Sequence, residues 1–394
     1  MKKIEYLLKN NLLIQKLYCI VFTVFFRFIG LFIRIDKKLV IFNSFSGKSF
    51  NDSPKVLYEA MLSRPEFKDY KFVWSFNHPK EFKGKLSCEV VKQDSFKYFL
   101  RVLKAGYWIT NVNIERGLKL QRKGNFYINT WHGTGPKTSG NFVKNRKDYD
   151  FKHVNAILTT CEYHENLFIN GFNARRSSLF RYGRPREDYL FNVLGDLDNE
   201  NRRLREKYSL PFDKKIILFA PTWRETKDKG ETYGTLQLFD LDKWSKELGG
   251  NYIILFKAHS ITNSYSIPKS SLVIDMSSVE DINELYVMSD YLVSDYSSCF
   301  SDFSILEKPM FCYAPDYDEY ISNRGILFDL NKYFVDKVIK DENTLIRAIK
   351  ELDFEKYAEK TRDFKKEFAC TEGNATEKVL SLILRNEKDE LQGN

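Results

Sequence analysis

Two histidines stand directly after apolar runs of the kind that form buried strands. His132 follows Tyr127–Thr130 and precedes a glycine, and His259 follows Ile254–Phe256 after a short basic link. A neutral imidazole can accept a proton from a hydroxyl group, and its N–H can donate a hydrogen bond to a phosphate oxygen. We therefore expect His132 to be a candidate general base and His259 a candidate phosphate contact. The alternatives are a histidine that caps a turn and a histidine with a structural role.

Two further strand ends carry groups suited to phosphate. Thr222 and Arg224 follow Ile217–Phe219 and offer a hydroxyl and a bidentate guanidinium, although Arg224 could also be a surface arginine. Residues 295–298 (Asp-Tyr-Ser-Ser) follow Leu292–Ser294 and open a predicted helix, whose free N–H groups could hold a diphosphate. The alternative is a simple N-cap by one of the two serines. Four such motifs at four strand ends predict one site.

Short apolar runs alternate with amphipathic stretches along the chain. The predicted strands are Leu39–Phe42, Lys71–Trp74, Tyr107–Thr110, Phe126–Thr130, Ala156–Thr160, Lys215–Ala220, Tyr252–Phe256, Leu272–Asp275, Tyr291–Ser294 and Met310–Tyr313. The predicted helices are Pro54–Leu62, Ser95–Lys104, Leu241–Leu248, Val279–Met288, Cys299–Leu306, Glu342–Glu351 and Thr376–Leu384. We expect a charged loop over Asn192–Glu206. This alternation predicts an α/β protein with two parallel-sheet domains, joined near residue 195, and a ligand cleft between them.

The excess positive charge of the chain is concentrated at its start. Residues 1–38 hold eight basic and two acidic residues, which is +6 of the net charge of +9, and the stretch from Leu12 to Ile35 is very apolar. On a helical wheel one stripe collects most of its polar, basic and small residues: Lys2, Lys9, Lys16, Thr23, Arg27, Gly30 and Arg34. A helix of this kind is typical of an anionic membrane surface. A transmembrane anchor and a helix buried against the protein are the alternatives.

Several classes of function lack support in the sequence. The six cysteines include no CxxC pair, which argues against a disulfide scaffold or a zinc ribbon and favours a reducing compartment. No histidine pair has metal-ligand spacing on one helix face, so we expect neither a metal nor a cofactor. The chain has no P-loop lysine motif, no GxGxxG and no GxSxG. The basic residues of the N-terminal stretch lie among bulky aliphatic side chains, which disfavours nucleic acid as a partner.

These motifs occur in the order of a known family. The matching segments are Phe45-Ser46-Gly47-Lys48 with Asp52-Ser53-Pro54-Lys55, Thr130-Trp131-His132-Gly133-Thr134, Tyr182-Gly183-Arg184-Pro185-Arg186 with Asp188, Ala220-Pro221-Thr222-Trp223-Arg224, Lys257-Ala258-His259, Ser294-Asp295-Tyr296-Ser297-Ser298 with Asp302, Lys308 and Pro309, and Tyr317, Tyr320 and Asn323-Arg324-Gly325. In them the chain resembles the CDP-glycerol glycerophosphotransferases of bacterial teichoic acid and capsule synthesis. In size it is nearer to the short, primase-like members.

The resemblance implies a GT-B type fold with a membrane-associating helix over residues 1–36, an acceptor domain over 37–195 and a CDP-polyol domain over 196–394. It also implies peripheral attachment to the cytoplasmic side of the cell membrane. The implied reaction moves a polyol phosphate from CDP-glycerol or CDP-ribitol to a hydroxyl of a lipid-linked glycan acceptor and releases CMP. A GT-B glycosyltransferase that uses a nucleotide sugar and a non-catalytic membrane-bound scaffold are the alternatives.

The resemblance also assigns residues to roles. His132 is the implied base on the acceptor hydroxyl, and His259 is the implied contact of the donor diphosphate. The expected substrate-binding residues are Gly133, Thr134, Lys137, Arg186, Thr222, Arg224, Lys257, Asp295, Ser297, Ser298, Asp302 and Arg324.

Overall fold

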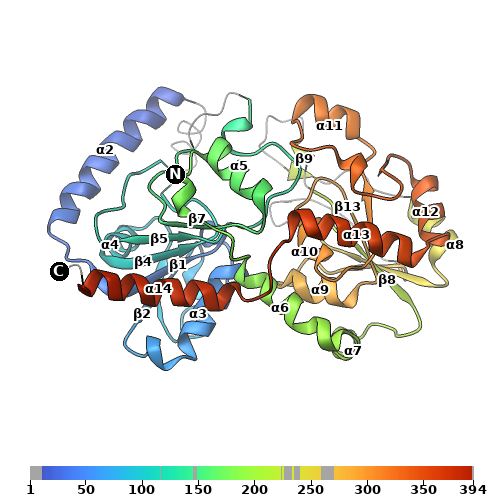
Figure 1. Cartoon of the computed structure of the whole chain (residues 1–394), viewed down its shortest axis with the longest axis horizontal. Coiled ribbons are helices and arrows are strands. Elements are labelled where there is room, and N and C mark those ends of the chain that lie inside the picture. Colours follow the sequence, from blue (N-terminus) through green and yellow to red (C-terminus); the bar gives the residue numbers. More distant parts are fainter. Residues whose placement is uncertain are drawn as a thin grey trace.

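The structure is a computed structural model that describes residues 11–115, 117–144, 149–222, 224–225, 233–234, 240–258 and 270–392. Two parallel β-sheets, each covered by helices, lie next to one another and give the molecule an elongated outline (Figure 1). The predicted two-sheet α/β architecture is confirmed, and each of the ten predicted strands coincides with an observed one. His259 lies outside the described residues, as does Trp223, and Arg224 is described only as part of a strand.

The first sheet has seven parallel strands in the order β3-β2-β1-β4-β5-β6-β7. The strands are β1 (Asp36–Asn43), β2 (Lys71–Phe76), β3 (Glu89–Lys92), β4 (Ala105–Thr110), β5 (Phe126–Asn129), β6 (Ala156–Leu158) and β7 (Leu179–Phe180). The strand order reverses direction between β1 and β4, where Ile41 pairs with Trp108. The carboxyl ends at such a reversal leave a crevice that open α/β sheets use for ligands.

The second sheet has six parallel strands in the order β12-β11-β8-β13-β14-β15. The strands are β8 (Lys215–Phe219), β11 (Tyr252–Phe256), β12 (Val273–Asp275), β13 (Tyr291–Ser294), β14 (Met310–Tyr313) and β15 (Val338–Ile339). Here the reversal lies between β8 and β13. A short antiparallel pair, β9 (Arg224–Glu225) and β10 (Tyr233–Gly234), follows β8.

Helices cover the faces of both sheets. They are α2 (Leu12–Leu31), α3 (Asp52–Leu62), α4 (Phe96–Lys104), α5 (Glu162–Phe172), α6 (Asp188–Asn192), α7 (Leu197–Lys207), α8 (Leu241–Leu248), α9 (Ile282–Met288), α10 (Cys299–Ser304), α11 (Tyr317–Asn323), α12 (Glu342–Lys350), α13 (Phe354–Phe368) and α14 (Ala375–Gln392). The predicted loop over Asn192–Glu206 is wrong, because most of it forms α7. Acidic residues in the first turn of α7 and basic residues in its last turn suit the helix dipole, and Leu204 is fully buried.

The last helix of the chain belongs with the first sheet. Val379, Leu380 and Ile383 of α14 are buried in one cluster with Phe42 and Trp74, and the hydroxyl of Tyr107 donates to the Ile383 carbonyl at 3.1 Å. Figure 1 shows α14 running beneath β4 and next to α3. The first sheet ends with β7 at Phe180 and the second begins with β8 at Lys215, while α14, which the predicted 196–394 domain includes, packs on the first sheet.

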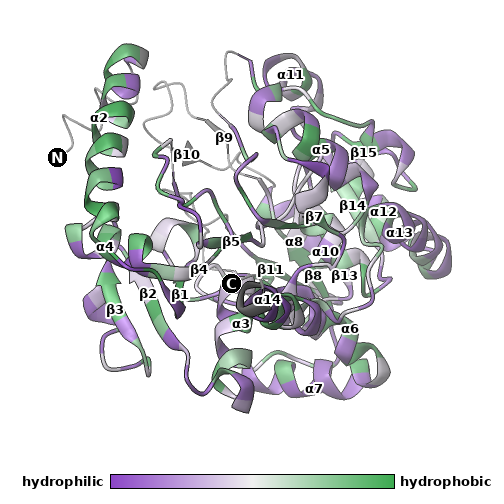
Figure 2. Cartoon of the chain, turned by 60° about the vertical axis from the view of Figure 1, so that its left-hand side comes forward, coloured by the Kyte–Doolittle hydropathy of each residue, from purple (hydrophilic) through white to green (hydrophobic). Residues whose placement is uncertain are grey.

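Helix α2 lies on the outside of the first half, which is the part of the molecule built on the first sheet (Figure 2), and most of its apolar side chains are exposed. Its exposed apolar residues are Leu13, Ile14, Leu17, Ile20, Val21, Phe22, Val24, Phe25, Phe28 and Leu31. By length and composition the span Leu13–Leu31 would be sufficient to cross a membrane.

Part of the predicted polar stripe, from Thr23 to Gly30, lies against the protein, whereas Lys16 and Arg34 are exposed. Thr23 Oγ1 accepts a hydrogen bond from the Lys119 amide at 3.2 Å, and Arg27 Nε donates to the Lys119 carbonyl at 3.2 Å. Gly30 lies against the Arg122 side chain. This part of the stripe is therefore bonded to the loop before β5 and does not point away from the molecule. Lys2 and Lys9 lie outside the described residues.

Candidate active site

His132 stands on a loop that leaves β5 at the carboxyl edge of the first sheet. The preceding Trp131 has φ of +53° and is buried, with its ring edge-on to those of Phe168 and Phe172. His132 Nδ1 lies 2.7 Å from the carbonyl oxygen of Asn111. Because a carbonyl can only accept, Nδ1 carries the proton, and Nε2 keeps a lone pair that can accept one. Burial lowers the pKa of His132 to about 4, so the ring is neutral near pH 7.

A left-handed segment forms one wall beside His132. Phe45, Ser46 and Gly47 follow β1 with φ of 45°, 56° and 79°. Asn111 Oδ1 accepts the Phe45 amide at 2.8 Å, and the Phe45 ring stands edge-on to His132 with the ring centroids 5.6 Å apart. Positive φ at two residues other than glycine is strained, typically by about 1–3 kcal/mol each, and such strain concentrates at functional sites. Asn111 therefore holds both the imidazole and the wall next to it.

The turn after β13 is tied to the end of β8. Asp295 Oδ1 accepts hydrogen bonds from the amides of Thr222 at 2.8 Å and Tyr296 at 2.7 Å. Ser297 Oγ accepts the Cys299 amide at 3.2 Å, so it satisfies the first amide of α10, while Ser298 occupies the N-cap position. The predicted residues Thr222, Asp295, Ser297 and Ser298 thus lie together beyond the ends of β8 and β13, at the strand reversal of the second sheet.

The His132 loop lies directly against this turn. A Cβ at Gly133 would stand 2.4 Å from Ser298 Oγ, and a Cβ at Gly135 would stand 2.9 Å from the Tyr296 carbonyl oxygen. Only residues without a side chain permit so close an approach. Further along the loop, the Leu327 amide donates to the Pro136 carbonyl at 2.6 Å and the Thr138 amide donates to the Gly325 carbonyl at 3.2 Å. The strand-end motifs of the two sheets therefore meet.

Buried charges lie beneath the meeting point. Arg186 pairs with Asp52 at 2.6 Å and with Asp302 at 2.9 Å, and Arg184 pairs with Glu187. Burial raises the pKa of Asp302 to about 7, which the neighbouring Arg186 only partly offsets. The structure thus brings Arg186 and Asp302, both predicted as substrate contacts, into one ion-pair network with Asp52.

Three other predicted site residues take part in backbone contacts within the protein. Lys257 donates from Nζ to the carbonyls of Ser277, at 2.9 Å, and Val279, and burial lowers the pKa of its ammonium group. Lys137 forms an isolated antiparallel bridge with Ile326. The carbonyl oxygen of Arg324 accepts from the Thr138 hydroxyl.

Sequence reasoning assigned no role to Asn111, Phe45 or His164. Asn111 follows β4 in the sequence Thr-Asn-Val-Asn, so the strand-end rule that found His132 could have found it as well. His164 is a buried residue of α5 whose Nδ1 lies 2.6 Å from the Thr160 hydroxyl. Burial lowers the pKa of His164 well below its usual value. No pattern in the local sequence predicted that His164 would be buried.

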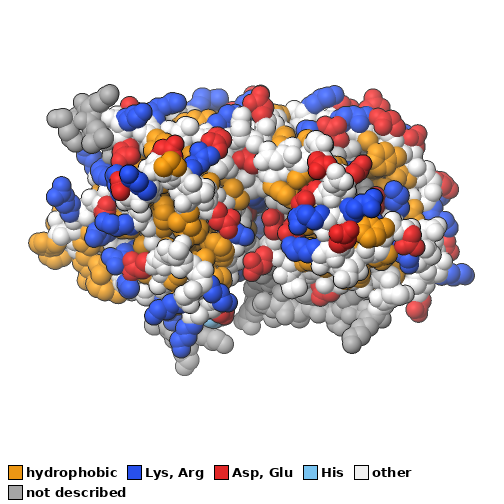
Figure 3. All heavy atoms as spheres, turned by 90° about the horizontal axis from the view of Figure 1, so that it is seen from below, with side chains coloured by type: hydrophobic (Ala, Val, Ile, Leu, Met, Phe, Trp, Pro, Cys, Tyr) orange, Lys and Arg blue, Asp and Glu red, His pale blue; other side chains and the backbone are white. Residues whose placement is uncertain are grey.

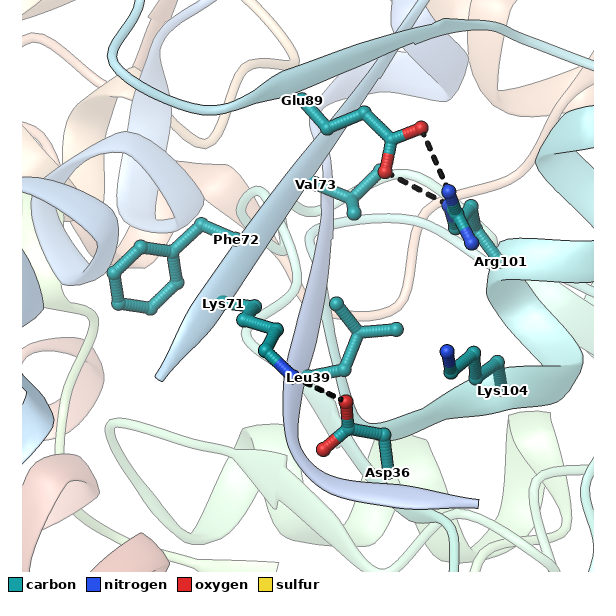
Figure 4. Close-up of a pocket in the computed structure, with 8 residues that line it drawn as sticks. All are labelled: Asp36, Leu39, Lys71, Phe72, Val73, Glu89, Arg101 and Lys104. Atoms are coloured by element: carbon teal, nitrogen blue, oxygen red, sulfur yellow. Dashed lines mark hydrogen bonds and ion pairs between the residues drawn. The ribbon is translucent and has the colours of Figure 1, made fainter. Parts of the chain in front are cut away.

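A separate cavity of about 310 Å³ lies at the amino ends of β1, β2 and β3 (Figure 4). Its charged residues are largely paired: Lys71 with Asp36 at 3.1 Å, and Arg101 with Glu89 at 2.8 Å. It contains none of the predicted site residues and lies at the edge of the sheet opposite to His132. Within the described part of the chain, no cluster of three or more His, Cys, Asp or Glu side chains could hold a metal ion.

Comparison with known proteins identifies the family. Residues 24–385 match the family described as CDP-glycerol:poly(glycerophosphate) glycerophosphotransferase. The chain belongs to this family. It is 31% identical over 384 residues to a teichoic acid poly(glycerol phosphate) polymerase of Staphylococcus epidermidis. The alignment covers 91% of this chain but only 52% of that relative's length. It is 30% identical to a polymerase of the same description from Bacillus spizizenii, with 97% of this chain and all of that relative aligned.

Solved structures agree with this assignment. The chain superposes with a TM-score of 0.82 on a variant of the wall teichoic acid polymerase TagF soaked with CDPG, at 29% identity, covering 96% of this chain and 97% of that one. A UDP-GlcNAc 2-epimerase from Neisseria meningitidis, at 10% identity and a TM-score of 0.53, shares the fold alone. The predicted GT-B type fold is therefore confirmed, and the family is one of transferase enzymes of teichoic acid synthesis.

Proposed function

We propose that this protein transfers glycerol phosphate from CDP-glycerol to a hydroxyl of a lipid-linked acceptor and releases CMP. The observation that carries the proposal is the contact of the His132 loop with the turn at Ser297 and Ser298, because it joins a candidate base to a candidate diphosphate site. Membership of the glycerophosphotransferase family and the likeness to a TagF structure soaked with CDPG support the choice of donor.

In this proposal the acceptor oxygen attacks the phosphorus that carries glycerol. A new P–O bond forms to the acceptor as the bond to the bridging oxygen breaks, and CMP leaves with that electron pair. His132 Nε2 takes the acceptor proton, while the Asn111 carbonyl keeps Nδ1 protonated and fixes the ring. The hydroxyls of Ser297 and Ser298 and the free N–H groups of that turn offset negative charge on the diphosphate.

Three further residues complete the proposed donor site. His259 is assigned to the diphosphate from the resemblance, and Arg224 is assigned to it because a guanidinium that follows the strand Ile217–Phe219 suits phosphate. The backbone at Thr222 is held beside the turn by Asp295. Positioning and charge stabilisation supply most of the rate in phosphoryl transfer, and the general base adds about 10²–10⁴-fold.

The test is CMP release by purified protein given CDP-glycerol and a synthetic lipid-linked disaccharide. His132→Ala should lose about 100-fold or more in turnover because it removes the base. His78→Ala, at an exposed histidine after β2, is the matched control and should keep wild-type turnover. Wild-type speed in a folded His132→Ala protein would refute the assignment of His132.

CDP-ribitol is the second candidate donor. A teichoic acid poly(ribitol-phosphate) polymerase of Bacillus spizizenii is 27% identical over 373 residues, which is 90% of this chain. Parallel reactions with CDP-glycerol and CDP-ribitol, followed by mass spectrometry of the lipid product, identify the transferred polyol and the number of units added. Release of UDP or GDP from a nucleotide sugar would instead favour the glycosyltransferase alternative.

We also propose that α2 attaches the enzyme to the cytoplasmic side of the membrane. Most of its apolar side chains are exposed while Thr23 and Arg27 bond to the protein, so the face available to lipid is mostly apolar. A lipid-linked acceptor resides in the same membrane, which would bring it close to the first half. Over the face seen in Figure 3, basic and acidic side chains are interspersed.

A further inference from the structure

We propose that Arg186 is a positioning residue that clamps the His132 loop between the two halves of the enzyme, in place of the substrate contact expected from the sequence. The clamp is a buried chain in which one guanidinium joins Asp52, the His132 backbone and Asp302. The proposal rests on the proposed function for its kinetic test, and a second measurement below is independent of activity.

The guanidinium reaches three different elements. Arg186 Nη1 pairs with Asp52 Oδ2 at 2.6 Å and donates to the His132 carbonyl oxygen at 2.9 Å. Arg186 Nη2 donates to Asp302 Oδ2 at 2.9 Å. Asp52 begins α3 in the first half, His132 follows β5, and Asp302 lies in α10 of the second half. A planar guanidinium presents five N–H donors in a fixed fork and so reaches acceptors on separate elements, whereas an ammonium group presents three donors from a single nitrogen.

The backbone of Arg186 is held as firmly as its side chain. Its amide donates to Ser53 Oγ at 3.3 Å, and its carbonyl accepts from Asn283 Nδ2 at 2.8 Å. Ser53 belongs to α3 and Asn283 to α9, so these bonds again connect the two halves. The clamp therefore starts from a residue whose own position is fixed from both sides.

Burial makes the pairing obligatory. Arg186 is 8% exposed and Asp302 is 3% exposed, so neither charge has water as an alternative partner. The two arginines Arg184 and Arg186 face three acids, Asp52, Glu187 and Asp302. Removing the Arg186 charge would leave carboxylates facing each other in a desolvated site, and they would separate or take up protons. Either response would release the His132 carbonyl from its place.

The expected consequence is a loss of turnover without a loss of donor binding. Gly133 and Gly135 pack against Ser298 and Tyr296, so the loop is seated only when its backbone is correctly placed. A shift of about 1 Å in a reacting group can cost about 100-fold in rate. Both Nη groups of Arg186 are already bonded to protein atoms, so the donor site should keep its affinity.

The kinetic test compares Arg186→Gln and Arg186→Lys with Arg205→Gln. Arg205 is a matched control: it is also buried, and it pairs with Asp290 at 3.0 Å at the amino ends of β8 and β13, away from His132. We expect Arg186→Gln to lower kcat for CMP release about 100-fold while the Kd for CDP-glycerol, measured by calorimetry, changes by less than about threefold. Arg186→Lys should recover part of the loss. Arg205→Gln should keep wild-type kcat at a temperature where it is folded.

Two outcomes would overturn the proposal. A rise of about tenfold or more in the Kd for CDP-glycerol would make Arg186 a donor contact, and an unchanged kcat would remove its positioning role. If Arg186→Gln does not fold, Asp302→Asn decides, because it keeps the side-chain volume and weakens one end of the clamp. Its kcat should fall about tenfold or more with Kd unchanged, and an unaltered kcat would refute the clamp.

Hydrogen exchange separates failure of the clamp from failure of the proposed reaction. The Thr138 and Leu327 amides are bonded between the loop and the second half, so they report whether the loop is seated. Both amides should exchange about tenfold or more faster in Arg186→Gln but at the wild-type rate in Arg205→Gln. Equal protection in all three proteins would refute the clamp whether or not the wild type uses CDP-glycerol.

Discussion

At the scale of single residues, His132 is defined by what binds its Nδ1. The Asn111 carbonyl fixes the tautomer at 2.7 Å, and the edge-on ring of Phe45 limits how far the imidazole can turn. The same Asn111 holds the Phe45 amide, so one residue fixes both the base and its wall. Orientation is thus set before an acceptor arrives, which lowers the entropic cost of reaching the reacting geometry.

The pH dependence of the reaction follows from the neutral state of His132. Burial lowers its pKa to about 4, so a base that must be unprotonated is available from about pH 5 upward. We expect the acid limb of kcat/KM to lie well below the usual histidine value of about 6.5. The acid limb of the kcat profile should lie at higher pH than that of kcat/KM, because a bound diphosphate stabilises the imidazolium.

A buried carboxyl adds a second titration to the same pH profile, and a variant without that carboxyl separates the two titrations. Burial raises the pKa of Asp302 to about 7, so its ionisation falls within the measured range. The profile should therefore be recorded for the wild type and for Asp302→Asn, in which this titration is absent. An inflection of kcat/KM near pH 6.5 that persists in Asp302→Asn would contradict the neutral-histidine assignment.

Gly133 is required by the contact between the two halves. Its φ is +119°, and an added Cβ would meet Ser298 Oγ at 2.4 Å and Ser298 Cβ at 2.8 Å. Gly133→Ala should therefore lower the free energy of unfolding by about 1–3 kcal/mol from backbone strain, with the clash in addition, and should also reduce turnover. Urea unfolding measures the first effect, and CMP release measures the second.

Gly195 supplies the matched control for this substitution. It lies in the segment between α6 and α7 with negative φ, and nothing stands within 4 Å of an added Cβ. Gly195→Ala should leave stability within about 1 kcal/mol of the wild type. Equal stabilities of the two alanine variants would mean that the loop can move away from Ser298 at little cost.

At the scale of elements, local pattern predicted the strands because buried parallel strands are short continuous apolar runs. Ile216–Phe219 and Ile253–Phe256 are buried at every residue, and polar residues begin where each strand leaves the sheet. The strand-end rule therefore located His132 and the turn at Ser297 as well. Helix α7 was missed because its charge density is typical of loops, although the structure buries Leu204 and Arg205 within it.

The network beneath the site could not be predicted from local sequence. Arg186 is 134 positions from Asp52 and 116 from Asp302, and its contacts exist only once two sheets have formed and met. The resemblance predicted that Arg186 and Asp302 matter but placed both on the substrate. For α2, the helical wheel predicted the polar stripe, whereas its direction toward Lys119 depends on a loop from a distant part of the chain.

Helix α2 should attach the protein to vesicles through its outward apolar face. Phe25 and Phe28 are 46% and 60% exposed there, and burying a phenylalanine side chain in lipid is worth about 1.5–3 kcal/mol. The double substitution Phe25→Ser and Phe28→Ser should weaken binding to vesicles of phosphatidylglycerol and phosphatidylcholine about tenfold or more, as measured by sedimentation. Circular dichroism checks that the fold is retained.

The second half offers a control of the same chemistry. Phe212 is 56% exposed and lies in the loop after α7. Phe354 is 50% exposed and is the first residue of α13. Substituting both by serine removes as much exposed aromatic surface without touching α2, so vesicle binding should be unchanged. A loss of binding in this control equal to that of the α2 variant would show that the membrane contact is not specific to α2.

At the scale of the whole molecule, three of the contacts that hold the two halves together involve the site or α14. The His132 loop is bonded to Gly325 and Leu327, and Arg186 joins α3 to α10. In the third contact Asp188 accepts the Ala375 and Thr376 amides at 2.9 and 2.8 Å, which caps the start of α14. One short stretch, Arg184–Asp188, therefore clamps the site and also anchors the helix that returns to the first sheet.

The return of α14 makes the stability of the first sheet depend on the last residues of the chain. Ile383 is fully buried in the cluster that contains Phe42 and Trp74, and its carbonyl accepts from the Tyr107 hydroxyl. Ile383→Ala should cost about 2–5 kcal/mol through lost burial and the cavity left behind, whereas Lys388→Ala, at an exposed position of the same helix, should cost less than about 0.5 kcal/mol. Hydrogen exchange of the β4 amides measures this loss of stability in the first sheet, whose residues are far from residue 383 in sequence. Faster exchange in β13 with unchanged protection in β4 would mean that α14 stabilises the second sheet, and that its packing on Phe42 and Trp74 adds little to the fold.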